Sequence, residues 1–170
     1  GIVYMIYNTK DLLVMVQDSM VRADHKWIYT IYDTLNRPVT TGRITDNTNY
    51  NNAAYHRGQA EPSSSYPNPG SYTNEELTKT FYDNYAWRSG EGNPLSDTRN
   101  TGDDTYLQSA SNTVWPYPQA VTQSALIKGM VTGTKTRVLG TSTWLYSVSI
   151  YDNKGRVIQV QSTNVSTGTD

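Results

Sequence analysis

Short stretches of alternating or continuous apolar residues recur along the chain, and this pattern predicts β-strands. The predicted strands are residues 2–7, 13–16, 27–31, 39–43, 77–87, 129–139, 144–151 and 157–160. Two long stretches, 44–76 and 88–119, are dense in Asn, Ser, Pro and Gly. We expect both to be irregular insertions outside the sheet, since these residues do not sustain strand pairing. Only residues 74–77 allow even a single helical turn, so the pattern predicts an all-β protein of antiparallel hairpins.

Three six-residue segments align without gaps, and each lies between two predicted strands. They are residues 7–12, 32–37 and 151–156, with the sequences YNTKDL, YDTLNR and YDNKGR. A strand that leads into Tyr, a four-residue loop and a returning strand together predict a β-hairpin. We call each segment a turn repeat and number its positions from 1 (Tyr) to 6.

The residue types at positions 2, 5 and 6 of the turn repeat favour a tight turn. An Asp at position 2 can accept hydrogen bonds from backbone amides two residues further on, as in an Asx-turn. Asn or Gly at position 5 tolerates the positive φ that such loops need. We expect the Arg at position 6 to lie against the Tyr ring at position 1. The first copy has Asn, Asp and Leu at positions 2, 5 and 6, so it keeps the turn chemistry without the arginine. These structural turn roles are assigned to Tyr7, Tyr32, Asp33, Asn36, Arg37, Tyr151, Asp152, Gly155 and Arg156.

The repeats resemble those of the RHS/YD-repeat family, most closely the large secreted RHS proteins of Bacteroidota. The residues that carry the resemblance are 27–38, 78–85, 128–140 and 151–159. The resemblance implies a long β-sheet ribbon that winds spirally into a hollow shell, of which this chain is part of the wall. In many members the shell encloses a C-terminal toxin behind a self-cleaving aspartyl core motif, and neither is recognisable in this sequence. Tyr82 and Asp83 depart from the pattern, because no Gly-Arg follows them.

The resemblance also implies a location and partners. The protein would be secreted or displayed on the cell surface, with the rest of the shell, an enclosed C-terminal effector or components of a secretion system as partners. Ser19 and Thr34 match an Asp-Ser/Thr-aliphatic pattern that is similar to the O-glycosylation sites of secreted Bacteroidota proteins, and Thr34 is the better acceptor at an exposed turn. We expect strands 2–7 and 157–160 to pair with material beyond this segment, because a ribbon has open edges at both ends.

Composition supports a sheet and excludes several classes of function. The chain has 14 Tyr and one Phe, and Tyr suits strands with a wet face because its ring can be buried while its hydroxyl stays hydrated. A net charge of −1 gives no electrostatic reason to expect a nucleic acid or an anionic membrane as partner. The absence of Cys excludes disulfides, thiolate metal sites and a Cys nucleophile. The longest apolar run, residues 12–16, is too short to span a bilayer.

Few residues offer site chemistry. His25 and His56 are the only histidines; neither has a partner at metal-ligand spacing, so structural roles are predicted for both. A Ser–His–Asp site stays open, since its members can be distant in sequence, although no G-x-S-x-G motif is present. Residues 129–136 are similar to a phosphate loop with the wrong spacing, and we interpret them as strand. We expect no catalytic residue, metal or cofactor. The acidic pairs, interpreted as solvated loop residues, are Glu75 with Glu76 and Asp103 with Asp104.

Three classes of function are compatible with the sequence. The leading hypothesis is a structural shell segment of a secreted RHS-repeat protein. The alternative is a cell-surface carbohydrate-binding or adhesion module, because exposed Tyr and Trp on strands are typical of such surfaces. A hydrolase comes third, for want of a recognisable site.

Overall fold

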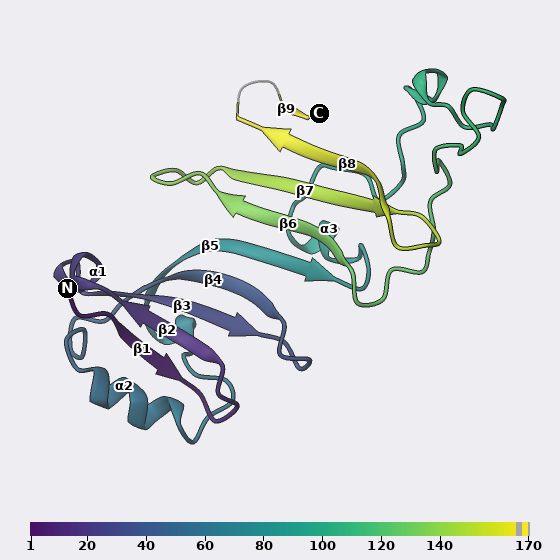
Figure 1. Cartoon of the computed structure of the whole chain (residues 1–170). Coiled ribbons are helices and arrows are strands. Elements are labelled where there is room, and N and C mark those ends of the chain that lie inside the picture. The colour runs from purple at the N-terminus through teal and green to yellow at the C-terminus, as the bar shows by residue number, and fades with distance from the viewer. Residues whose placement is uncertain (166–167, 170) are drawn as a thin grey trace. The chain divides into compact units, whose positions relative to one another are not determined.

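The computed structural model describes residues 1–165 and 168–169 of the chain, most of whose regular structure is β-strand (Figure 1). The prediction of an all-β fold is therefore confirmed. The strands are β1 (Tyr4–Tyr7), β2 (Leu13–Gln17), β3 (Lys26–Tyr32), β4 (Pro38–Thr45), β5 (Thr73–Tyr82), β6 (Val131–Arg137), β7 (Trp144–Tyr151), β8 (Val157–Asn164) and β9 (Gly168–Thr169). The short helices are α1 (Ser19–Ala23), α2 (Ala53–Ala60) and α3 (Trp87–Gly90), with 3-10 turns η1 (Pro69–Ser71) and η2 (Asp104–Tyr106).

The chain forms two compact units, which are described separately. The first consists of residues 1–79 with 139–141, and the second of residues 80–138 with the residues from 142 on. Strand β5 begins in the first unit and ends in the second. In the part of the chain that the structure describes, no helix has the length and apolar character needed to cross a membrane.

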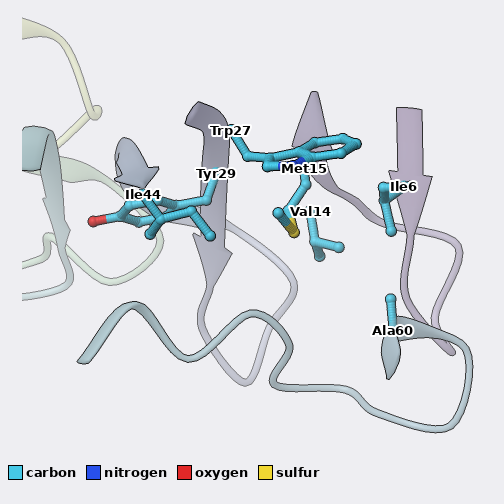
Figure 2. Close-up of a cluster of buried hydrophobic side chains, with 7 residues drawn as sticks. All are labelled: Ile6, Val14, Met15, Trp27, Tyr29, Ile44 and Ala60. Carbon is cyan, nitrogen blue, oxygen red and sulfur yellow. The ribbon is translucent and has the colours of Figure 1, made fainter. Parts of the chain in front are cut away.

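In the first unit, strands β1 to β5 pair antiparallel, each with the next in sequence. The register aligns Ile6 with Met15 and Met15 with Tyr29, so these side chains share one face of the sheet. Figure 2 shows this cluster, with Ala60 of α2 facing Ile6. The core of the first unit thus lies between this face and α2. Its buried residues are Ile6, Val14, Met15, Trp27, Tyr29, Ile44 and Ala60.

In the second unit, β6, β7 and β8 form antiparallel pairs, and β8 also pairs with β9. Val148 and Ile150 of β7 are fully buried and pack against Leu95 from the insertion that precedes β6. The core of this unit therefore needs the insertion to cover one face of the sheet. Partly buried side chains around it are Tyr85, Trp87, Tyr146 and Ile158.

The structure contains helices that the sequence pattern did not predict. The side chain of Asp18 caps α1 by accepting from Val21 N–H (2.9 Å), and Asn52 caps α2 by accepting from Tyr55 N–H (2.9 Å). Helix α2 lacks a periodic apolar face; it buries His56 and Ala60 instead, so tertiary contacts stabilise it. The single turn allowed at residues 74–77 is wrong, because these residues lie in β5.

Each predicted insertion lies largely outside the strands. Residues 46–72 and 88–119 contain no strand. The sheet does extend into the predicted stretch 44–76 at both ends, where Ile44 pairs with Asn74 and Thr45 with Thr73. The strand predicted at residues 77–87 therefore starts earlier, at Thr73, and ends at Tyr82.

Candidate functional site

The second and third turn repeats fold into the same tight turn. The N–H of Asp33 donates to the carbonyl at position 6 (2.9 Å), and the N–H of Asn36 donates to the carbonyl of Asp33 (3.0 Å). The corresponding bonds of Asp152 and Gly155 measure 2.9 and 3.2 Å. Position 5 has a positive φ in both copies, +61° and +75°, the conformation that Asn and Gly adopt at least cost.

The carboxylate at position 2 holds each turn with three further hydrogen bonds. One oxygen of Asp33 accepts from the N–H groups of Leu35 (2.8 Å) and Arg37 (2.9 Å), and the other accepts from Arg37 Nε (2.7 Å). Asp152 accepts the same set, at 2.9, 2.8 and 2.6 Å. Each arginine thus makes a charge-assisted bond with the aspartate of its own turn, a contact that differs from the predicted ring contact.

These hydrogen bonds stabilise the ionised form of both aspartates. Burial is the largest single influence on each and opposes ionisation. The amide and guanidinium hydrogen bonds together outweigh it and hold the pKa of Asp33 and of Asp152 below the ordinary value. The side chain of Asp152 is 3% exposed and that of Asp33 21%. In these two turns the carboxylate is therefore charged, and the folded chain surrounds it with donors.

The first turn repeat makes the same backbone bonds with a neutral side chain. Asn8 Oδ1 accepts from the N–H groups of Lys10 (2.9 Å) and Leu12 (3.1 Å), and Asp11 at position 5 has a φ of +57°. Lys10 Nζ donates to Asn36 Oδ1 of the second turn (3.0 Å). The first and second turns therefore lie beside each other and are joined by a side-chain hydrogen bond.

The strand register shifts at the same point of all three copies. The shift falls between Ile6 and Tyr7, between Ile31 and Tyr32, and between Ile150 and Tyr151. In each copy it pairs the Tyr with the residue directly after its turn repeat, namely Leu13, Pro38 and Val157. The register skips one residue of each returning strand, namely Val14, Val39 and Ile158. A β-bulge directly after the turn is thus part of the repeat.

The tyrosine at position 1 joins its hairpin to the strand before it in the two later copies. Tyr32 Oη donates to the carbonyl of Leu13 on β2 (2.9 Å), and Tyr151 Oη donates to the carbonyl of Val131 on β6 (2.6 Å). Burial raises the pKa of Tyr32. Tyr7 is 45% exposed, and its hydroxyl contacts Met5 Sδ (3.6 Å). The repeat therefore links each of the two later hairpins to its neighbour through one hydroxyl.

Tyr82 and Asp83 form a different structure, as their departure from the pattern suggests. The N–H of Asp83 donates to the carbonyl of Met130 (3.1 Å), and its carboxylate accepts from Gly129 N–H (2.6 Å). Asp83 and Gly129 both have a positive φ. Instead of closing a hairpin, this aspartate holds together the two ends of the insertion between β5 and β6.

His56 lies at the centre of a buried polar cluster in the first unit. Its Nε2 is 3.2 Å from the carbonyl of Asn49, and its Nδ1 is 2.6 Å from Tyr66 Oη. A carbonyl can only accept, so Nε2 carries the proton and Nδ1 accepts from Tyr66. Asp46 accepts from two backbone amides with one oxygen, and its other oxygen lies 3.6 Å from His56 Nε2. Burial lowers the pKa of His56, although the Asp46 carboxylate opposes this effect.

This cluster fastens the insertion 46–72 to the sheet. His56 and Gln17 are fully buried, and Gln17 Nε2 donates to the carbonyls of Lys26 (2.8 Å) and Tyr50 (2.6 Å). With no exposed surface, His56 cannot reach a dissolved substrate in this conformation. The geometry supports a structural anchor.

The other candidate residues are dispersed. His25 has a φ of +57°, and its ring stacks on Tyr50 with centroids 3.7 Å apart. Among the residues with described positions, no three His, Asp or Glu side chains are grouped to hold a metal. Residues 131–136 of the phosphate-loop-like segment lie in β6. Of the acidic residues on the predicted loops, Glu75 pairs with Arg43 (2.5 Å), Glu76 with Lys79 (3.3 Å) and Asp104 with Arg99.

The two O-glycosylation candidates lie at the surface. Thr34 is exposed at position 3 of the second turn repeat, and Ser19 is exposed as the first residue of α1. Both hydroxyls are thus placed where a modifying enzyme could approach.

Comparison of the chain with models of known protein families, with curated proteins and with solved structures gave no match. The fold and the site geometry therefore carry the functional argument.

Proposed function

We propose that this chain is a wall segment of an RHS/YD-repeat β-sheet shell, in a protein that is secreted or displayed on the cell surface. One observation carries the proposal: the turn repeat recurs three times with the same backbone hydrogen bonds, the same positive φ at position 5 and the same bulge. Such repetition is typical of proteins built by adding one supersecondary unit to the next.

The repeat supplies what an extending wall needs. The aspartate fixes each hairpin turn locally, and the tyrosine ties that hairpin to the strand before it. Addition of a further hairpin therefore brings its own fastening. The partners in this proposal are the rest of the shell or an enclosed C-terminal effector, with components of a secretion system during export.

The outer edge of β1 supports the same proposal. β1 comes first in the strand order of the sheet and pairs with β2 on one side. Tyr32 and Tyr151 each donate to a carbonyl on a preceding strand. By the same rule, we expect a strand beside β1 whose carbonyl accepts from Tyr7.

Imaging of the natural protein that contains this sequence tests the proposal. We expect electron microscopy to show a hollow particle with a wall one sheet thick, and density for a further strand along β1. A solid particle, or a β1 edge covered only by solvent, would contradict the wall function.

A carbohydrate-binding or adhesive role is a second candidate, favoured by one observation. Tyr106, Trp115 and Tyr117 are strongly exposed in the insertion of the second unit, and exposed aromatic rings are typical of sugar-binding surfaces. A glycan array separates the two proposals. Saturable binding that is lost in Trp115→Ala and kept in Val114→Ala would favour the binding module.

A further inference from the structure

Three glutamines of the second unit hold one short segment entirely through its backbone. We call residues 96–100 the strap, and Gln123, Gln159 and Gln161 the glutamine clamp. Gln161 Oε1 accepts from Ser96 N–H (3.1 Å), and its Nε2 donates to the carbonyl of Thr98 (2.9 Å). Gln159 accepts from the N–H of Asn100 (2.8 Å) and donates to the carbonyl of the same residue (2.9 Å).

Gln123 binds the strap through a different set of peptide groups. Its Oε1 accepts from Arg99 N–H (2.8 Å), and its Nε2 donates to the carbonyl of Asp97 (2.7 Å). Gln159 and Gln161 thus bind groups of the even-numbered strap residues, and Gln123 binds groups of the odd-numbered ones. This alternation is how a chain is bound from both sides, as between two strands of a sheet. The strap itself belongs to no strand and bends at Asp97 and Thr98.

The clamp recognises peptide groups, without regard to the strap's side chains. A glutamine amide has one acceptor and one donor group, the same pair that a peptide group presents. All six clamp bonds end on strap N–H or C=O groups. A different sequence with the same backbone could make the same six bonds.

The position of the strap at the surface would also allow it to detach from the clamp. Four of its five residues are exposed; only Arg99 is partly buried. An open hollow of about 730 Å³ lies beside it, lined by residues that include Asp103 and Val160. A second chain that makes the same hydrogen bonds would compensate for those that the strap gives up, so it could take the strap's place.

We propose that the glutamine clamp is a binding site for a polypeptide backbone, which this chain fills with its own strap and which a second polypeptide can occupy in its place. The ligand class is a short unfolded peptide segment, bound independently of its sequence. The clamp involves none of the turn repeats, so this site and the wall function can stand or fall separately.

Fluorescence anisotropy with a labelled peptide that copies residues 95–101 tests the proposal on the full chain. The Arg99→Gln variant breaks the ion pair of the strap with Asp104 and leaves the amide that donates to Gln123. We expect it to bind the peptide about tenfold more tightly than the wild-type chain, because its own strap competes less. A scrambled peptide of the same composition should bind equally well.

Changes in the clamp itself locate the binding. In the Arg99→Gln background, Gln159→Leu with Gln161→Leu should weaken binding about tenfold or more, since four hydrogen bonds to the peptide are lost. Gln119→Leu is the matched control, because Gln119 accepts from Gln108 N–H outside the strap. If circular dichroism shows that the leucine variants are unfolded, the double variant Gln159→Glu with Gln161→Glu takes their place. It keeps the acceptor oxygens and removes the donor groups, so it should still weaken binding.

Three results would overturn the proposal. The first is no binding to either the wild-type or the Arg99→Gln chain; the clamp would then serve only to fix the insertion. The second is binding that survives the loss of the clamp glutamines. The third is failure of the scrambled peptide, which would show that side chains are recognised.

Discussion

The two units use the same hairpin turn but attach their insertions in opposite ways. The first unit buries the polar groups that hold residues 46–72, with His56 and Gln17 fully enclosed. The second unit covers its core with Leu95 and then holds the chain after it with the glutamine clamp on exposed residues. One insertion is thus held by buried polar groups of the first unit, and the other by hydrogen bonds to mostly exposed residues of the second unit.

Because of this difference, we expect the two insertions to respond differently to substitutions that remove their hydrogen bonds. A buried polar group that loses its partner costs its full desolvation energy, whereas an exposed one regains water. The insertion of the first unit should therefore open only together with its sheet. The strap of the second unit should open locally, while its sheet stays folded.

The largest effect should come from His56→Ala. The variant leaves a cavity and removes the partners of Tyr66 and of the Asn49 carbonyl, so the free energy of unfolding of the first unit should fall by about 3 kcal/mol. Hydrogen exchange should show lost protection across β1–β4 and little change in β6–β8. His25→Asn, which suits a positive φ, is the control. Loss of protection confined to residues 46–72 would contradict the expectation that this insertion opens only together with the strands of its unit.

Two glycines, one in each unit, test whether aromatic rings pack equally closely against the backbone of both units. A Cβ at Gly42 would lie 2.5 Å from the Tyr29 ring and 2.6 Å from the Glu75 carbonyl, and one at Gly133 would overlap the Trp87 ring. Gly42→Ala and Gly133→Ala should each lower the free energy of unfolding by about 2 kcal/mol through overpacking. Gly58→Ala, with nothing within 4 Å in α2, should stabilise the chain by about 0.5–1 kcal/mol. Thermal melts measure the stability of all three variants. If Gly133→Ala is as stable as the wild type, the two units differ in how closely a ring packs on the backbone.

The carboxylate of the turn repeat can be tested by substitution and by pH. Asp33→Ala should cost about 2 kcal/mol, and Asp33→Asn about 1 kcal/mol, because Asn8 shows that an amide keeps the two backbone bonds while the charged bond to Arg37 is lost. The pKa of Asp33 is lowered from 3.8, so its contribution is complete above that pH and is lost as the pH falls through the lowered pKa. Urea titrations at pH 6 and pH 3 should show a smaller pH effect in Asp33→Asn. Equal pH effects in variant and wild type would contradict the assignment.

A milder pH effect should single out the first unit. Burial lowers the pKa of His56 from 6.5, so the unfolded chain binds a proton below that pH while the folded chain does not. Stability is therefore complete above about pH 6.5 and declines as the pH falls toward the lowered pKa. Denaturation at pH 7.5 and pH 5 should show this decline in the wild type and less of it in His56→Gln. A decline confined to the second unit would exclude His56 as its cause.

The smallest effect should distinguish the tyrosines. Tyr32→Phe and Tyr151→Phe each remove a hydroxyl that donates to a carbonyl and should cost about 1 kcal/mol. Tyr7→Phe should lower the stability of the isolated chain very little, since among the described residues this hydroxyl contacts the nearby Met5 sulfur (3.6 Å) and no carbonyl. Thermal melts of the three variants measure the difference. A loss of stability in Tyr7→Phe equal to that in the other two variants would contradict the proposed role of the β1 edge.

Features that depend on interactions within about six residues can be predicted from the amino-acid sequence alone. Alternating apolar positions located the strands, and the residue types at positions 2 and 5 of the turn repeat indicated where the chain reverses. They did so because an Asx-turn and a positive φ are local properties of a few side chains. Pro, Gly and Asn density marked the insertions for the same reason, since it opposes strand pairing wherever it occurs.

Contacts between groups that are distant in the sequence become visible in the folded chain. Helix α2 has no periodic apolar face, and it exists because His56 and Ala60 are buried against the sheet. Asp46, His56 and Tyr66 have no sequence spacing that indicates a cluster. The guanidinium of Arg37 could contact either a ring or a carboxylate, and the geometry of the folded turn places it beside Asp33. The glutamine clamp depends on three residues brought to one segment by the folded chain. Burial and long-range hydrogen bonding are properties of the whole fold, so a pattern read along the chain cannot contain them.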